Sequence, residues 1–183
     1  MNNCWIENDI IPDLNQSEKD WLIENFDGRL DPEYNLVITW ENELPLSITK
    51  KFMTIGKHLG LKLSTTSVFT GTPGKMVLPH IDKIDGYDPM PWRLSYFVQG
   101  GCPFYWWEPG EIVRKGPYAL IQDETVLIDS LDTTETKSAF LRTEVPHNVD
   151  MTGNDMTRIV VTATYRETDK KNASWDYLTN RLK

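Results

Sequence analysis

Apolar side chains recur at helical spacing in the first third of the chain. Intervals of four, three and four residues predict a helix that begins near Ser47 and ends at Gly60. The apolar side chains of this helix are Ile48, Phe52, Ile55 and Leu59. A shorter helix is expected before it, with Ser17 as its N-terminal cap and Gly28 as its stop. The apolar side chains of the shorter helix are Trp21, Leu22 and Phe26. We expect both helices to pack on the outside of the structure that the rest of the chain forms.

From residue 61 onward the pattern changes to short β-type runs, separated by segments rich in glycine, proline, asparagine and aspartate. The runs are Leu61–Thr70, Lys75–Asp82, Trp92–Gln99, Cys102–Trp107, Tyr118–Gln122, Thr125–Ser130, Ser138–Val145 and Arg158–Arg166. Strands without intervening helices predict an antiparallel sandwich or barrel. The expected fold class is mainly β with flanking helices, in a single domain over 1–183. Its expected parts are an N-terminal helical region at 1–60, a β core at 61–168 and a C-terminal segment at 169–183, with a helix at Ser174–Arg181.

Composition and charge narrow the class of protein. The formal net charge is −8 and no run is rich in lysine or arginine, so no nucleic-acid partner is expected. No apolar stretch approaches the roughly 20 residues that span a bilayer, so no membrane segment is expected either. The acidic N-terminus lacks the apolar core of a signal peptide, and we expect a cytoplasmic protein. Cys4 and Cys102 are too few for a disulfide framework, and each is expected to be a small buried side chain or a free thiol.

Two of the three histidines form an ordered pattern with one aspartate. His80 and Asp82 lie two residues apart in a β-type run, so both side chains point to the same face. His147 must come from a distant strand, which an antiparallel double-sheet barrel would bring back beside the first. Two imidazoles and one carboxylate can bind Fe(II) on one side and leave three positions open, enough for a bidentate oxo-acid and O2. The third histidine, His58, falls on the polar side of the second predicted helix, and we exclude it.

An arginine at the start of the last β-type run completes the pattern. Arg158 follows His147 by eleven residues, and alternation places it on one face with Val160, Thr162 and Thr164. If this face lines a barrel, the guanidinium is buried and needs an anionic partner, because a buried unpaired charge is very costly. A dicarboxylate ligand would supply the anion, and Thr162 would add a hydroxyl contact.

The pattern His80-X-Asp82, followed by His147 and Arg158 on a chain of short strands, resembles the 2-oxoglutarate/Fe(II)-dependent dioxygenases. The resemblance covers roughly residues 61 to 168 and implies a double-stranded β-helix, a jelly-roll barrel like that of the cupins. It implies Fe(II) on the two histidines and the aspartate, and 2-oxoglutarate with its far carboxylate on Arg158. The chain is more similar to the prolyl-hydroxylase-like and aspartyl/asparaginyl-hydroxylase-like branches than to small-molecule hydroxylases, and similar in size to some phage-encoded members. Many members have a small polar residue two positions after the arginine, where this chain has Val160.

The implied activity is the hydroxylation of an unidentified substrate, a protein residue or a small molecule, with release of succinate and CO2. The implied partners are 2-oxoglutarate, O2 and that substrate, and we expect a monomer or a weak dimer. One rival is a cupin-type metal enzyme that does not use 2-oxoglutarate; Arg158 argues against it, since such a site needs no partner for a far carboxylate. A second rival is a binding or virion-associated β-barrel without catalysis.

One further candidate for the co-substrate site depends on the register of the run Trp92–Gln99. Arg93 and Tyr96 lie on opposite faces of this run, and either face can look inward. In the aspartyl/asparaginyl-hydroxylase-like branch an inward arginine on this strand helps to hold the co-substrate, which makes Arg93 a candidate. Tyr96 is the candidate if the register is reversed.

Aromatic residues supply the candidates for the substrate. Trp106 and Trp107 belong to four consecutive aromatic residues, for which a substrate wall and ordinary core packing are both open. Tyr87 lies in the loop Lys83–Pro91, which directly follows Asp82 and is placed to act as a lid or substrate loop.

Overall fold

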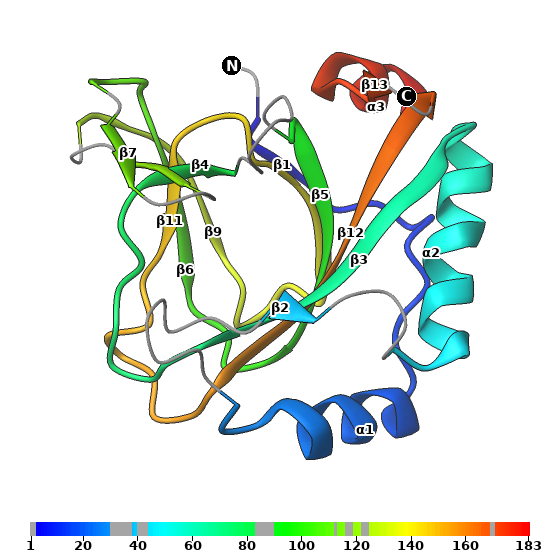
Figure 1. Ribbon diagram of the computed structural model, residues 1–183, viewed down its shortest axis with the longest axis horizontal. Helices are drawn as coiled ribbons and strands as arrows, with labels where there is room; N and C mark the ends of the chain where they lie inside the picture. Colours follow the sequence, from blue (N-terminus) through cyan, green and yellow to red (C-terminus); the bar gives the residue numbers. More distant parts are fainter. Residues whose placement is uncertain are drawn as a thin grey trace.

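The computed structural model describes residues 3–29, 38–39, 44–82, 90–111, 113–115, 119–121, 125–168 and 171–183. Two antiparallel sheets face each other, and helices cover the outer side of one of them (Figure 1). The strands of the major sheet are β1 (Trp5–Ile6), β2 (Ile38–Thr39), β3 (Lys62–Gly71), β5 (Trp92–Gln99), β10 (Ser138–Arg142), β12 (Arg158–Thr168) and β13 (Lys171–Asn172). The strands of the minor sheet are β4 (His80–Asp82), β6 (Pro103–Trp107), β7 (Val113–Lys115), β8 (Ala119–Ile121), β9 (Leu127–Asp132) and β11 (His147–Val149). Their orders are β1-β10-β5-β12-β3-β2, with β13 on β12, and β7-β8-β4-β11-β6-β9.

A nested set of strand pairs closes the barrel. The innermost pair is β6 with β9, and around it lie β5 with β10, β4 with β11 and β3 with β12. From β3 to β6 successive strands alternate between the two sheets, and the strands β9 to β12 alternate in the same way as the chain returns past their partners in the reverse order. The two halves of the chain therefore wind together as a double-stranded β-helix, which confirms the predicted fold class.

Alternation along the strands separates two layers of packing. On β12, Ile159, Val161 and Ala163 belong to the core beneath the helices α1 (Gln16–Phe26) and α2 (Leu46–Leu59). The intervening residues, which include Arg158 and Thr162, therefore face the barrel interior. Figure 1 shows α2 along the outer side of β3, and α1 below the same sheet. The helices thus cover the major sheet from outside and leave its inner surface for the site.

The predicted helices are present, with a different cap on the first. Asn15, and not Ser17, caps α1: its side chain accepts from the backbone N–H of Glu18, whose carboxylate accepts from the backbone N–H of Asn15. The second helix ends as expected at Gly60, which takes a left-handed conformation with φ of 71°. The last helix, α3 (Trp175–Arg181), begins after Ser174. No helix in the described part of the chain is long and apolar enough to cross a membrane.

Several strands differ from the predicted runs. The short strands β1 and β2 lie in the N-terminal region for which only helices were expected. The run Lys75–Asp82 is a strand only at its last three residues, and the run Ser138–Val145 ends as a strand at Arg142. Beyond Arg142 the chain crosses toward the other sheet: the backbone N–H groups of Thr143 and Glu144 both donate to the carbonyl of Pro91, and the carbonyl of Thr143 accepts from the backbone N–H of Asp82. Strand β8 falls within the predicted run Tyr118–Gln122, whereas the separate strands β7 and β11 were not predicted.

The end of β3 leaves no space for a side chain at Gly71. An added Cβ would overlap Sδ of Met151 and would lie 3.4 Å from Cβ of Arg158. We expect Gly71→Ala to lower the free energy of unfolding by about 1–3 kcal/mol, because overpacking displaces the thioether. Urea denaturation measures this change. Gly153→Ala is the matched control, since its Cβ would meet no atom within 4 Å and should change stability by less than about 0.5 kcal/mol. Equal effects of the two changes would contradict the expectation.

Candidate functional site

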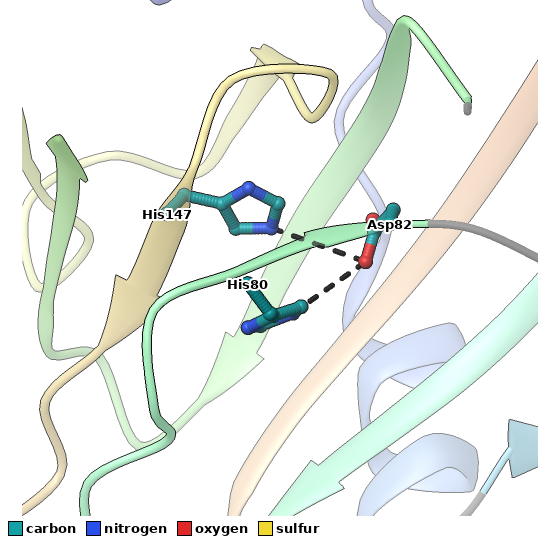
Figure 2. A group of neighbouring side chains, drawn as sticks. All are labelled: His80, Asp82 and His147. Carbon is teal, nitrogen blue, oxygen red and sulfur yellow. Dashed lines mark ion pairs between the residues drawn. The ribbon is translucent and has the colours of Figure 1, made fainter. Parts of the chain in front are cut away.

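The pairing of β4 with β11 brings the predicted metal ligands together. His147 lies directly opposite His80 in this ladder, and Asp82 follows on the same face of β4. Figure 2 shows both imidazoles directed toward the Asp82 carboxylate. These three are the residues that could hold a metal ion among those that the structure describes.

The spacing of the donor atoms suits a metal centre. Oδ1 of Asp82 lies 3.5 Å from Nε2 of His80 and 3.9 Å from Nε2 of His147. One ligand atom from each residue can be chosen so that all lie within 4.8 Å of one another. Metal bonds of about 2.1 Å require donor atoms about 3 Å apart, so small side-chain rotations would close the three atoms around one ion.

Backbone carbonyls select the same tautomer in both histidines. Nδ1 of His80 lies 2.8 Å from the carbonyl oxygen of Leu78, and Nδ1 of His147 lies 2.9 Å from that of Val145. A carbonyl only accepts, so each Nδ1 carries the hydrogen and donates it. The lone pair of each Nε2 is then directed toward Asp82 and is available to a metal.

The charges of the triad also favour a cation. Burial alone would raise the pKa of Asp82, but the Arg93 guanidinium and the neighbouring His80 and His147 outweigh it, so the pKa lies well below its usual range. Burial, with a smaller effect of His80, lowers the pKa of His147 to about 4. At neutral pH the site therefore offers an ionised carboxylate and a neutral His147 imidazole, which is the state that binds divalent metals.

The register of β5 places Arg93 inside the barrel. Its Nε lies 2.7 Å from Oδ2 of Asp82, and its guanidinium lies 4.8 Å from the centre of the Phe69 ring. Tyr96 lies on the other face, in the core beneath the helices, where its hydroxyl donates to the carbonyl of Pro12 at 2.5 Å. The reversed register is therefore wrong, and Tyr96 is not at the site. Arg93 pairs with the carboxylate of Asp82, and its contact with the co-substrate stays a prediction.

Arg158 is a buried cation in the same interior. It is 8% exposed and begins β12 opposite Gly71, with its guanidinium beside the thiol of Cys102. Burial lowers the pKa of Arg158, yet a guanidinium keeps its proton in proteins. Within the described ranges its Nε has no hydrogen-bond partner and no carboxylate pairs with it. The charge is therefore uncompensated by these residues, which is the condition for binding an anion.

Side chains of β6 and of the residue just before it line the interior between Arg158 and the triad. Cys102 beside Arg158 and Phe104 lie two residues apart and belong to the same inner cluster. The Phe104 ring stacks on His147, with ring centroids 5.2 Å apart and an interplanar angle of 14°. On the opposite wall, Thr162 lies inward and is paired with Ser67 and Ser95 in the two neighbouring ladders. The sequence analysis included Phe104 in the aromatic run but did not single it out, although its alternation with the inward Trp106 was a signal for it.

The two candidate tryptophans are not at an entrance. Trp106 is completely buried, and its indole N–H donates to the carbonyl of Arg142 at 2.7 Å. Trp107 lies on the outer face of the minor sheet, where its indole N–H donates to Oδ1 of Asn148 at 2.8 Å. The prediction of a substrate wall is therefore wrong for both. Tyr87 and residues 83–89 of the loop lie outside the described residues.

The segment between β6 and β9, which contains β7 and β8, pairs with β4, the strand that carries His80 and Asp82. Its strand β8 pairs with β4, so that Ile121 lies opposite His80 and Ala119 opposite Asp82. The open edge of β4 is thereby paired, with β11 on its other side. The sequence predicted a strand at Tyr118–Gln122 but not that this strand pairs with β4.

No protein-family model matches the sequence, and no curated protein is similar enough to match it. Solved structures share the fold. The non-haem α-ketoglutarate-dependent carbocyclase SnoK from nogalamycin biosynthesis is 13% identical with a TM-score of 0.52, over 99% of this chain and 87% of its own. A prolyl hydroxylase of Trichoplax adhaerens, solved with a hypoxia-inducible-factor peptide fragment, is 13% identical with a TM-score of 0.50, over 90% of this chain and 84% of its own. The chain therefore has the fold of the 2-oxoglutarate/Fe(II) oxygenases.

Acid is expected to destabilise the metal-free protein in a pH window that His147 sets. The ordinary pKa of this imidazole is 6.5, and burial lowers it to about 4 in the folded protein. Between these values the unfolded chain binds a proton that the folded protein does not, so the free energy of unfolding falls as the pH drops, by at most about 3 kcal/mol. Urea denaturation with a chelator, from about pH 7 to about pH 4.5, measures the slope. His147→Gln should flatten it, and an unchanged slope would contradict the assignment.

Proposed function

We propose that this protein is an Fe(II)- and 2-oxoglutarate-dependent oxygenase that hydroxylates a substrate still to be identified. The observation that carries the proposal is the buried, uncompensated guanidinium of Arg158 in the same barrel interior as the ligand triad. A metal site alone accounts for the triad, but it does not account for the buried positive charge of Arg158. A co-substrate that both chelates a metal and presents a second carboxylate explains both features.

Each residue has a part in this proposal. His80, Asp82 and His147 would hold Fe(II) through two neutral nitrogens and one oxygen, Arg158 would bind the far carboxylate of 2-oxoglutarate, and Thr162 would add a hydroxyl contact. When bound, the iron and 2-oxoglutarate would supply the oxidation of a C–H bond by O2, with release of succinate and CO2. The residues themselves orient these groups and keep them in a buried interior.

The rival functions explain less of the interior. A cupin-type enzyme without 2-oxoglutarate uses the metal but has no need of Arg158. A binding barrel without catalysis needs neither the common tautomer of the two histidines nor their convergence on Asp82. Within the proposal we favour a protein residue as substrate, as the likeness to prolyl-hydroxylase-like and aspartyl/asparaginyl-hydroxylase-like proteins suggests, and a monomer or weak dimer as the working form.

We expect His147→Ala to abolish stoichiometric binding of Fe(II) at micromolar metal, because one of the three donors is lost. Anaerobic titration calorimetry measures the binding. His58→Ala is the matched control, since His58 is exposed on α2 and should leave the affinity unchanged. Retention of one tightly bound Fe(II) in the His147 variant would show that the triad is not the metal site.

We expect Arg158→Ala to weaken 2-oxoglutarate binding by roughly 30-fold or more, because truncation of one partner of a buried charge pair costs about 2–5 kcal/mol. Fe(II) affinity should change far less. Anaerobic titration of the metal-loaded protein measures the first quantity, and succinate formation under O2 reports turnover. Arg181→Ala, at an exposed position of α3, should bind as the wild type does. An unchanged 2-oxoglutarate affinity in the Arg158 variant would remove the argument for this co-substrate.

A further inference from the structure

The two oxygens of the Asp82 carboxylate have different partners. Oδ1 lies 3.5 Å and 3.9 Å from the ligand nitrogens of His80 and His147, and Figure 2 shows both imidazoles directed at this oxygen. Oδ2 lies 2.7 Å from Nε of Arg93. The carboxylate is therefore divided between the metal-binding nitrogens on one side and a cation on the other.

The position of Arg93 is held by its surroundings. Its strand, β5, lies between β10 and β12 in the middle of the major sheet, and the side chain is 11% exposed. The guanidinium lies over the Phe69 ring, with 4.8 Å to the ring centre, which favours a cation at this place. The Nε–H bond does not have hydrogen-bond geometry toward Oδ2, so the attraction to Asp82 is that of an ion pair. Arg93 is thus a fixed positive charge on one oxygen of a metal ligand.

We propose that Arg93 is a positioning residue that makes Asp82 a one-oxygen ligand of the metal. The inference rests on the proposed function, because it concerns the ion that the triad would bind. A carboxylate with both oxygens free can bind a divalent ion through one or both of them. A guanidinium on Oδ2 excludes the second contact, so the triad fills three positions of an octahedral ion and leaves the others open.

The proposal predicts the direction in which Arg93 changes the affinity of the site for a metal ion. Arg93 and the metal are both cations, and both bind the same carboxylate. Arg93 therefore weakens metal binding while it keeps coordination positions free. A residue whose only role is to support the fold would do the opposite, because its loss would loosen the site and weaken metal binding.

The first test uses the unaltered protein loaded with Mn(II), which prefers octahedral coordination. Pulsed EPR in deuterated water counts the water molecules bound to the ion. A one-oxygen Asp82 predicts about three waters per ion, and a two-oxygen Asp82 predicts about two, which would overturn the proposal. Absence of Mn(II) binding by the unaltered protein would instead overturn the proposed function, so the two failures are distinguishable.

The second test replaces the cation. Arg93→Met keeps a long side chain without charge. We expect this variant to bind Mn(II) roughly tenfold more tightly and with about one water fewer. The reason is that a positive charge within a few ångströms of the carboxylate shifts the binding of a cation to it by about a factor of ten or more. Arg93→Lys keeps the charge and should retain the wild-type water count. Arg142→Met is the matched control: Arg142 pairs with Glu144 at 2.8 Å and should leave both quantities unchanged.

Two results of this second test would overturn the proposal. One is weaker Mn(II) binding by Arg93→Met with an unchanged water count, which would mean that Arg93 supports the fold only. The other is unchanged Mn(II) binding with weaker 2-oxoglutarate binding, which would make Arg93 a co-substrate contact. If Arg93→Met does not fold, the wild-type count and the lysine variant decide: a lysine variant that loses a water contradicts the proposal, and one that keeps the wild-type count supports it.

Discussion

Backbone hydrogen bonds between β4 and β11 are the constraint on which the candidate site depends. This ladder alone places His147 opposite His80, although the two residues are far apart in the sequence. A slip of β11 by one residue would direct Asn148 into the barrel and His147 out of it. The strands on either side, β8 and β6, oppose such a slip because they pair with β4 and β11 along the same residues. The positions of the three candidate metal ligands therefore depend on the register of four short strands.

Charge is the second constraint on the interior. Asp82 offsets the guanidinium of Arg93, while Arg158 has no acidic partner in the described part of the chain. Apolar surroundings such as Phe69 and Phe104 make each of these charges expensive to bury. The interior is thus balanced at the triad and positively charged at the start of β12. Under the proposed function, this asymmetry would orient a dicarboxylate with its metal-binding end toward the triad and its other end toward β12.

The spacing of apolar residues predicted helices and strands from the sequence, but it did not predict which of the two faces of a strand points into the barrel. The apolar stripe of α2 and the limits of β5 followed from residue spacing, and so did the convergence of the ligand triad, since two-residue alternation and antiparallel return require it. Alternation does not say which face of β5 is inner, so Arg93 and Tyr96 remained alternatives until packing against the helices decided. Asn15 and Ser17 are equally good caps, and only the reciprocal bond with Glu18 distinguishes them. Two-residue strands such as β1 are too short to show the alternation of apolar and polar residues from which a strand is predicted.

The nested pairing also has a consequence for the order of folding. The pair β6 with β9 closes a short loop, whereas β3 with β12 joins the most distant strands of the barrel, and long loops are the slowest to close. His147 and Arg158 both belong to the returning half of the chain. On a ribosome, neither the His80–Asp82–His147 cluster nor the surroundings of Arg158 form until this half has emerged and paired. A ligand that binds only the finished interior would therefore stabilise the complete barrel and not its folding intermediates, so it would drive the last step of folding to completion.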